Sequence, residues 1–130
     1  MDKKRILIVD DEEAFTRILK VNLESTDKYT VRVENKGALA LEAAHTFNPH
    51  LILLDIVMPD IDGSEVAAQL KEDARCKNIP LIFLTALVTN KETDHGCSTI
   101  SGYPFIAKPI NLTTLVACIE QNLNKGTGAN

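Results

Sequence analysis

Short apolar runs alternate along the chain with segments of helical periodicity. Residues 6–9, 51–54 and 81–84 are apolar runs of four residues, too short for helices, and we predict them to be strands. A fully apolar run such as 51–54 is typical of a strand covered on both faces. Residues 30–33 alternate between apolar and polar side chains, which predicts a further strand, and residues 103–107 are assigned as the fifth.

Apolar residues recur at helical spacing between these runs. The predicted helices cover about residues 12–24, 38–47, 65–73 and 112–123, the last capped by Asn111. Strands that alternate with helices predict right-handed βαβ units, and therefore a doubly wound parallel sheet with helices on both faces. Sites in such sheets form at the carboxyl ends of the strands, near the point where the strand order reverses.

Composition and charge exclude several classes of protein. The 130 residues are 45% hydrophobic and 25% charged, which is typical of one globular domain and not of a disordered chain. No apolar run approaches the roughly 18 residues of a membrane span, and the N-terminus lacks a signal peptide, so we expect a soluble, cytoplasmic protein with no membrane association. The net charge of −4 offers no basic surface for nucleic acid. We expect residues 1–124 to form the domain and residues 125–130 to form a flexible tail.

The cysteines and histidines show no metal-ligand spacing. The cysteines are odd in number and contain no CxxC pair, which disfavours a disulfide framework or a zinc site. We predict that they are buried or half-buried reduced thiols, because free cysteine packs as a small hydrophobic residue. The residues concerned are Cys76, Cys97 and Cys118, with the histidines His45, His50 and His95.

Polar or charged residues directly follow four of the five predicted strands. They are Asp10 and Asp11 after the first strand, Asp55 after the third, Thr85 after the fourth and Lys108 after the fifth. At an effective dielectric near 20, each pair of like charges about 4 Å apart costs on the order of 4 kcal/mol, so three carboxylates at one edge need a counter-charge. Mg²⁺ fits, because it takes one or two carboxylates, several waters and phosphate oxygens. A lysine and a threonine hydroxyl at the same edge suit a phosphoryl group.

Four stretches of sequence carry a resemblance to a known family. They are Ile8–Glu12 (IVDDE), Leu54–Gly63 (LDIVMPDIDG), Leu84–Ala86 (LTA) and Phe105–Pro109 (FIAKP). In this order, each at the end of a predicted strand, they resemble the receiver domain of two-component response regulators over residues 4–124. The resemblance implies a flavodoxin-like fold with five parallel strands in the order 2-1-3-4-5 and five helices.

The resemblance also implies a function for each strand end. Asp55 would be the phosphoacceptor, a carboxylate nucleophile that takes a phosphoryl group from a phosphohistidine. Thr85 and Lys108 would bind that phosphoryl group, and Phe105 would change rotamer with Thr85 as a conformational switch. The Lys108–Pro109 peptide bond is expected to be cis. Mg²⁺, with Mn²⁺ as a substitute, would be held by Asp10, Asp11, Asp55 and the backbone carbonyl of Val57.

The partners implied are a histidine kinase or a histidine phosphotransfer protein, and then a downstream protein target or a missing output domain. The chain would be no enzyme beyond catalysing its own phosphorylation and dephosphorylation at Asp55. A stand-alone regulator and a receiver cut from a larger protein both remain open. We expect a monomer or a weak homodimer.

Two other functions share part of this residue set. An aspartate-nucleophile phosphatase or phosphotransferase also needs a carboxylate, Mg²⁺ and a lysine, but Val57 stands where such enzymes are expected to have a general acid. A phosphorylation-independent pseudo-receiver would use the fold only for binding. Locally, Asp11 is also a candidate cap of the first helix, and Asp62-Gly63 predicts a turn with positive φ at Gly63.

Residues 88–103 depart from the family pattern. They include two glycines and several hydroxyl-bearing residues, which disfavour a helix interior, and Pro104 removes a hydrogen-bond donor from the fifth strand. We predict that the fourth helix is short or mobile and that the edge of the fifth strand is atypical. Strong protection from hydrogen exchange throughout 88–103 would contradict this hypothesis.

Overall fold

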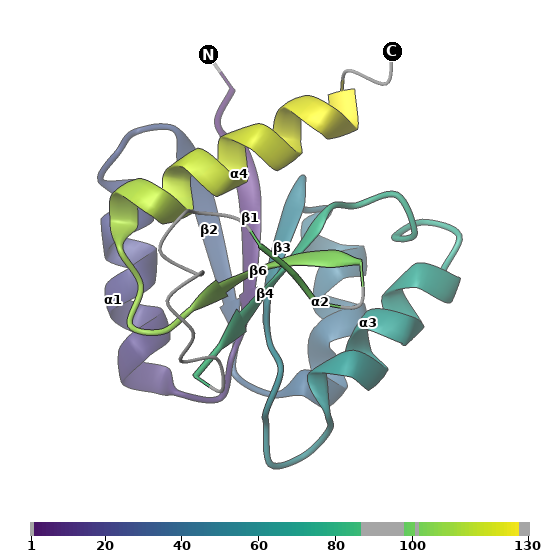
Figure 1. Cartoon of the computed structure of the whole chain (residues 1–130). Helices are drawn as coiled ribbons and strands as arrows, with labels where there is room; N and C mark the ends of the chain where they lie inside the picture. Colours follow the sequence, from purple (N-terminus) through teal and green to yellow (C-terminus); the bar gives the residue numbers. More distant parts are fainter. Residues whose placement is uncertain (1, 87–97, 101, 128–130) are drawn as a thin grey trace.

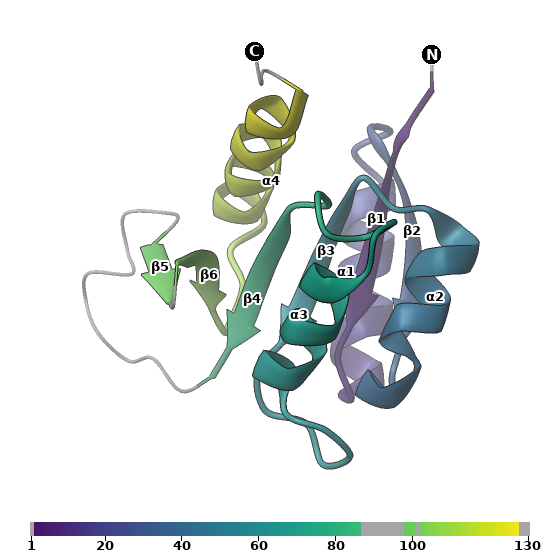
Figure 2. The same cartoon turned by 90° about the vertical axis from the view of Figure 1, so that its right-hand side faces the viewer.

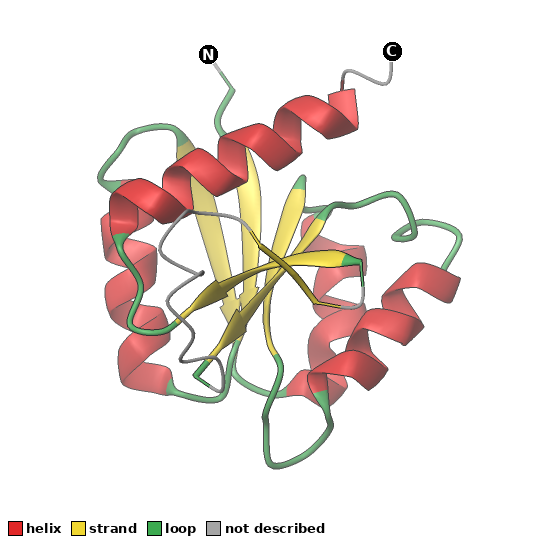
Figure 3. Cartoon of the chain, in the orientation of Figure 1, coloured by secondary structure: helices red, strands yellow, loops and turns green. Residues whose placement is uncertain are grey.

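The computed structural model describes residues 2–86, 98–100 and 102–127. These residues form a sheet between two layers of helices (Figures 1 and 3). The strands are β1 (Lys4–Val9), β2 (Tyr29–Glu34), β3 (Leu51–Asp55), β4 (Leu81–Thr85), β5 (Ser98–Ile100) and β6 (Tyr103–Ala107). The helices are α1 (Glu13–Glu24), α2 (Ala40–Phe47), α3 (Gly63–Glu72) and α4 (Leu112–Thr127), with one 3-10 turn, η1 (Gly37–Leu39).

The sheet has the order β2-β1-β3-β4-β6-β5, and all neighbours pair in parallel except β5 and β6. The predicted fifth strand is β6, so the predicted parallel order 2-1-3-4-5 is confirmed. β5 was not predicted; it pairs antiparallel with β6 and covers the edge that was expected to be atypical.

The number of helices differs from the prediction. Four α-helices, and not five, occur in the described residues. The predicted fourth helix falls in 88–103, of which residues 88–97 and 101 lie outside the described part, so its length and mobility stay a prediction. Helix α4 continues to Thr127, three residues past the predicted domain end at 124.

Two apolar cores separate the sheet from its helices. α1 and α4 cover one face and α2 and α3 cover the other, as the side view shows (Figure 2). Every residue of β3 and β4 is buried, as the apolar runs indicated, because both faces of these central strands contact helices. A parallel sheet covered in this way leaves the carboxyl ends of its strands as the natural place for polar groups.

Two short-range predictions at helix starts have different outcomes. Asn111 caps α4, since its Oδ1 accepts a hydrogen bond from the backbone N–H of Thr114 at 3.0 Å. Asp11 does not cap α1: the N-cap is Glu12, which makes no side-chain capping bond. The backbone N–H of Glu12 instead donates to Oδ1 of Asp10 at 2.9 Å.

Gly63 is required for a close approach of backbone segments. The prediction of a positive φ at Gly63 is wrong; among the described glycines only Gly102, between β5 and β6, has one (φ 85°). A Cβ on Gly63 would lie 2.3 Å from the carbonyl oxygen of Asp55 and 2.7 Å from Cα of Ile56. The start of α3 therefore packs directly on the chain that follows β3.

The cysteines differ from one another. Cys76 is a free, buried thiol, as predicted, whereas Cys118 is disulfide-bonded, so the prediction of a reduced thiol is wrong there. Cys97 lies outside the described residues. Among the described helices, none combines the length and the apolar character that crossing a membrane requires.

Candidate phosphoacceptor site

The carboxyl ends of four neighbouring strands bring the predicted site residues together. β1 pairs with β3, β3 with β4, and β4 with β6, so the residues at their ends meet at one edge of the sheet. The strand order reverses between β1 and β3, which is where a parallel sheet of this type opens a crevice. The residues gathered at this edge are Asp10, Asp11, Asp55, Thr85 and Lys108.

Three carboxylates form the acidic part of this edge. Asp10, Asp11 and Asp55 each offer an oxygen, and these oxygens lie within 4.8 Å of one another. Asp10 is fully buried and Asp55 is 5% exposed. Oδ2 of Asp10 is buried and pairs with Nζ of Lys108 at 2.9 Å, a single contact that leaves the oxygen with a further lone pair. A buried carboxylate oxygen with spare capacity, beside two further carboxylates, fits a hard divalent cation.

Lys108 places a positively charged ammonium group beside these carboxylates. Its Nζ lies 2.6 Å from Oε1 of Glu12 and 4.0 Å from Oδ2 of Asp55, in addition to the contact with Asp10. The amine also lies 4.4 Å from the centre of the Phe15 ring, a cation–π distance. Its side chain is only 12% exposed, so the charge reaches the carboxylates with little screening by solvent.

The backbone fixes the direction of Lys108. Its N–H donates to the carbonyl oxygen of Thr85 at 2.7 Å, and the peptide bond to Pro109 is cis, as expected. Thr85 is buried at the end of β4, where it pairs with Ala107. The hydroxyl-bearing residue and the lysine are therefore placed by adjacent strands.

The electrostatics of the site favour a bound cation. Burial raises the pKa of Asp55 to about 7, the negative charge of Asp10 adds to this effect, and Lys108 opposes it. Burial also raises the pKa of Asp10, against the hydrogen bond and charge of Lys108. Burial alone would lower the pKa of Lys108, but its bonds to Glu12 and Asp10 and the charge of Asp55 raise it. A divalent cation would favour the ionised form of each carboxylate.

The pKa of Asp55 predicts a pH-dependent stability. An aspartate in the unfolded chain has a pKa of about 3.9, so between about pH 4 and 7 the folded state retains a proton that the unfolded state has lost. The free energy of unfolding should therefore fall as pH rises through this window. In chelator, Asp55→Asn should be more stable than wild type at about pH 8, by on the order of 4 kcal/mol, and the difference should vanish near pH 4.

Urea denaturation of both proteins across this pH range measures the effect. Equal stability of wild type and Asp55→Asn at every pH would show that the carboxyl group is not perturbed by its surroundings.

The remaining predicted residues lie around this core. Val57 donates its backbone N–H to Oδ1 of Asp55 at 3.4 Å, and its side chain is 58% exposed. Phe105 is buried on β6, where it pairs with Phe83 of β4. Its aromatic ring belongs to the core between the sheet and α3.

Two contributions were not found from the sequence. Glu12 was predicted as the start of the first helix and as part of a matching stretch, but not as a partner of Lys108, whose amine lies 2.6 Å from its Oε1. Asn35 donates from Nδ2 to the carbonyl oxygen of Asp10 at 2.8 Å and to Oγ1 of Thr16 at 3.2 Å, which fixes the end of β1. Neither contact has a local signal, because the partners are far apart in the sequence.

A sequence profile of the response regulator receiver domain matches residues 6–120. The chain belongs to this family. The receiver domain is 32% identical over 124 residues to the polar-differentiation response regulator DivK of Brucella anthropi, covering 92% of this chain and 96% of DivK. It is 37% identical over 116 residues to the response regulator PleD of Caulobacter vibrioides, covering 89% of this chain and 25% of PleD. The chain thus spans about a quarter of PleD but nearly all of DivK.

Solved structures give the same result for the fold. A CheY-like response regulator receiver domain protein from Methanospirillum hungatei JF-1 superimposes with a TM-score of 0.82 at 26% identity, covering 99% of this chain and 100% of that one. The signal receiver domain of a modulated diguanylate cyclase from Desulfovibrio desulfuricans G20 has a TM-score of 0.76 at 31% identity, with the same coverage. The receiver domain is a signalling module of two-component systems, and its family generally uses Mg²⁺ for phosphorylation. Family membership favours this function over the aspartate-nucleophile phosphatase.

Proposed function

We propose that Asp55 accepts a phosphoryl group from the phosphohistidine of a histidine kinase or phosphotransfer protein, in a reaction that needs Mg²⁺. The observation that carries the proposal is the convergence of Asp55, Asp10 and Lys108 at one edge of the sheet. Oδ2 of Asp55 lies 4.0 Å from Nζ of Lys108, which lies 2.9 Å from Oδ2 of Asp10. A nucleophile, a cation-binding carboxylate and an ammonium group are the parts that phosphoryl transfer to a carboxylate requires.

The chemistry follows from these positions. An oxygen of the Asp55 carboxylate attacks phosphorus, the P–N bond of the phosphohistidine breaks, and the imidazole leaves with the bonding electron pair. The product is an acyl phosphate, which adds about −1 to −2 of charge if it behaves as phosphoserine does. Lys108 is close enough to pair with this charge after a small rotation of its side chain. When bound, Mg²⁺ neutralises charge on the phosphoryl oxygens.

The metal ligands proposed are those implied by the family resemblance. Mg²⁺, or Mn²⁺ in its place, would bind carboxylates of Asp10, Asp11 and Asp55 and the backbone carbonyl of Val57. The spare oxygen of Asp10 and the spacing of the three carboxylates support this assignment. Beyond this self-directed chemistry at Asp55, we infer no further enzymatic activity.

Thr85 and Phe105 are proposed as the conformational switch. Thr85 ends β4 and pairs with Ala107 of β6, and Phe105 lies on β6 two residues before Ala107. Phe105 has no hydroxyl, and the switch would be purely steric. Phosphorylation needs only to stabilise one of two packings of these side chains to shift their populations.

Phosphorylation by a small-molecule donor tests the proposal. Wild-type protein incubated with acetyl phosphate and Mg²⁺ should gain the mass of one phosphoryl group, and peptide mapping should place it in the segment that contains Asp55. Chelation of the metal should abolish the gain. A protein that gains no mass with Mg²⁺ present would be a pseudo-receiver, and the proposal would be wrong.

The phosphodonor protein is proposed to dock beside the site, in a groove between α1 and the segment that leads into α4. Its apolar lining includes Phe15, Ile18 and Ile110, and it also includes Glu12 and Lys108 of the site. Ile18 is 62% exposed although it is a large apolar side chain. A protein that delivers phosphohistidine to Asp55 must contact this groove, because the groove and the site share Glu12 and Lys108.

Ile18→Lys should slow transfer from a protein donor by about tenfold, the equivalent of roughly 1.4 kcal/mol of lost docking energy, and leave acetyl phosphate labelling unchanged. Val21→Lys is the matched control, because Val21 is also 62% exposed on α1 but does not line the groove. Rates are measured with any kinase or phosphotransfer protein that labels the wild type. Equal rates for both variants would place the donor elsewhere.

The wider setting is proposed on the same basis. Residues 1–124 would form the receiver domain and residues 125–130 a flexible tail, which begins as the last residues of α4. The domain would act in the cytoplasm as a monomer or weak homodimer. The phosphorylated form would control a downstream protein or an output domain, without direct contact with nucleic acid.

A further inference from the structure

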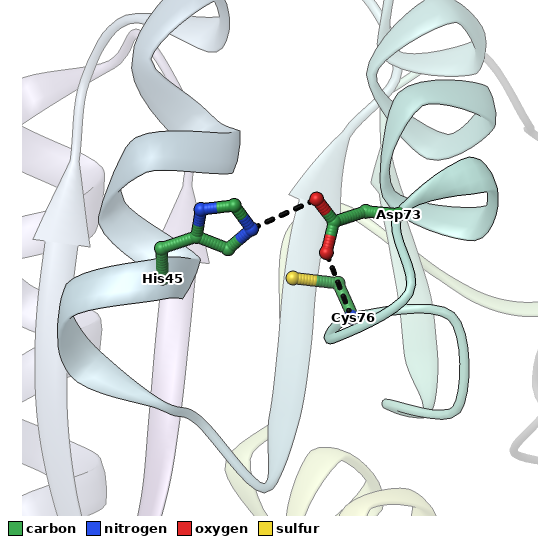
Figure 4. A group of neighbouring side chains, drawn as sticks. All are labelled: His45, Asp73 and Cys76. Carbon is green, nitrogen blue, oxygen red and sulfur yellow. Dashed lines mark hydrogen bonds and ion pairs between the residues drawn. The ribbon is translucent and has the colours of Figure 1, made fainter.

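A second cluster of ligand-type side chains lies at the opposite edge of the sheet from Asp55. His45 belongs to the last turn of α2, Asp73 is the C-cap of α3, and Cys76 lies in the turn that follows (Figure 4). The chain enters β3 and β4 after these segments, so the cluster is at the amino ends of the strands. None of the three residues takes part in the phosphoacceptor site.

The side chains of the cluster converge on one another. Nε2 of His45 lies 2.8 Å from Oδ2 of Asp73. One ligand atom from each of His45, Asp73 and Cys76 lies within 4.8 Å of the other two. Figure 4 shows the imidazole, the carboxylate and the thiol directed into the space between α2 and the end of α3.

We propose that His45, Asp73 and Cys76 bind one thiophilic divalent metal ion, with Zn²⁺ as the best fit. Nitrogen, carboxylate oxygen and thiolate sulfur are the ligands that zinc takes in proteins, while Mg²⁺ and Ca²⁺ prefer oxygen alone. The side chains of His45 and Asp73 are 31% and 19% exposed, so water can occupy a fourth position. Three protein ligands with one open position is a common zinc arrangement.

The distances require only small side-chain adjustments. At Zn–N and Zn–O distances of about 2.05 Å, two ligands of a tetrahedral ion are about 3.3 Å apart, and a sulfur ligand lies about 3.6 Å from each of them. The His45–Asp73 contact of 2.8 Å would therefore open by about 0.5 Å. The thiol starts at no more than 4.8 Å from either ligand atom, within reach of a rotamer adjustment.

The surroundings hold the carboxylate in a suitable orientation. Oδ1 of Asp73 accepts hydrogen bonds from the backbone N–H groups of Arg75 and Cys76, at 2.9 and 3.1 Å. These bonds occupy one carboxylate oxygen and leave Oδ2 directed at His45. Bonds of this kind orient metal ligands in known sites.

Two groups oppose binding. The thiol of Cys76 is 2% exposed and burial raises its pKa, so coordination has to release its proton to solvent. Arg75 brings a positive charge, since its guanidinium donates to the carbonyl oxygen of His45 at 3.1 Å. That guanidinium is exposed, so solvent screens its repulsion of a bound cation.

Cobalt(II) binding tests the proposal without reference to phosphorylation. Co²⁺ is titrated into the reduced full chain in a large excess of Mg²⁺, which occupies the oxygen ligands near Asp55 and does not compete for a thiolate. A sulfur-to-cobalt charge-transfer band should appear in the near ultraviolet at one equivalent and should disappear on addition of Zn²⁺. Cys76→Ser should abolish the band, and His45→Gln should weaken Co²⁺ binding at least tenfold.

Matched controls test one other cysteine and one other histidine. Cys118→Ser removes another buried cysteine, and His50→Gln removes a half-buried imidazole that bonds to the backbone N–H of Arg5. Both variants should retain the band, and circular dichroism should show that all four variants are folded. Absence of the band in wild type, or its survival in Cys76→Ser, would overturn the proposal and leave the cluster as a hydrogen-bonded contact between α2 and α3.

Discussion

Asp55→Asn should lose phosphorylation completely. The amide keeps the shape of the carboxylate but offers neither its negative charge nor its nucleophilic oxygen, so no acyl phosphate can form. Asp55 is 5% exposed, and its Oδ2 lies 4.0 Å from Nζ of Lys108, the ammonium group proposed to pair with the phosphoryl charge. Intact-mass measurement after incubation with acetyl phosphate and Mg²⁺ should show one added phosphoryl group in wild type and none in the variant.

Asp62→Asn is the matched control for this experiment. Asp62 is an exposed aspartate seven positions later, at the end of the loop that follows β3, where its Oδ1 caps α3 by accepting from the N–H of Ser64 at 3.4 Å. The control should be labelled at the wild-type rate. Labelling of Asp55→Asn at a comparable rate would mean that a different residue accepts the phosphoryl group.

Gly63→Ala should destabilise the fold by about 3 kcal/mol, because overpacking against backbone cannot be relieved by a rotamer change. The new Cβ would lie 2.3 Å from the carbonyl oxygen of Asp55, and the N–H of Gly63 is tied to the carbonyl oxygen of Ile56 at 2.7 Å. The chain after β3 would have to move, and Asp55 with it. Urea denaturation measures the loss, and a slower rate of phosphorylation should accompany it.

Gly37→Ala is the control for close packing without a backbone clash. A Cβ there would lie 2.5 Å from Cγ2 of Ile61, a methyl group that moves with the χ1 torsion, and 2.9 Å from Cε of Met58, the end of a flexible side chain. We expect a loss below about 1.5 kcal/mol. Equal losses in the free energy of unfolding for Gly63→Ala and Gly37→Ala would show that the backbone after β3 can shift as easily as a side chain can change rotamer.

The fold could be predicted where burial alone determines the pattern. β3 and β4 are buried on both faces, so their apolar runs mark them directly. β5 has no such signal, because its three residues form a strand only through pairing with β6. Tertiary pairing of this kind overrides local propensity.

The site could be predicted at the level of residue types but not of contacts. Residues that end parallel strands must meet at one edge, which is why Asp55 and Lys108 were placed together. The contact of Glu12 with Lys108 spans 96 positions, and the contact of His45 with Asp73 spans 28. Arguments from ligand spacing consider residues within one motif, so they missed ligands that two helices bring together.

The two carboxylate partners of Lys108 link phosphorylation of Asp55 to the charge on the protein surface. In the unmodified chain its ammonium group is shared by Asp10, which is buried, and Glu12, whose side chain is 58% exposed. A phosphoryl group on Asp55 would compete for that ammonium group. Glu12 is the partner that can give it up at the lower cost, because water can solvate its exposed carboxylate. Glu12 would then lose its ion pair with Lys108 and carry an unpaired negative charge in the groove that Ile18 also lines. Phosphorylation of a buried residue would in this way change the surface charge before any strand or helix moves.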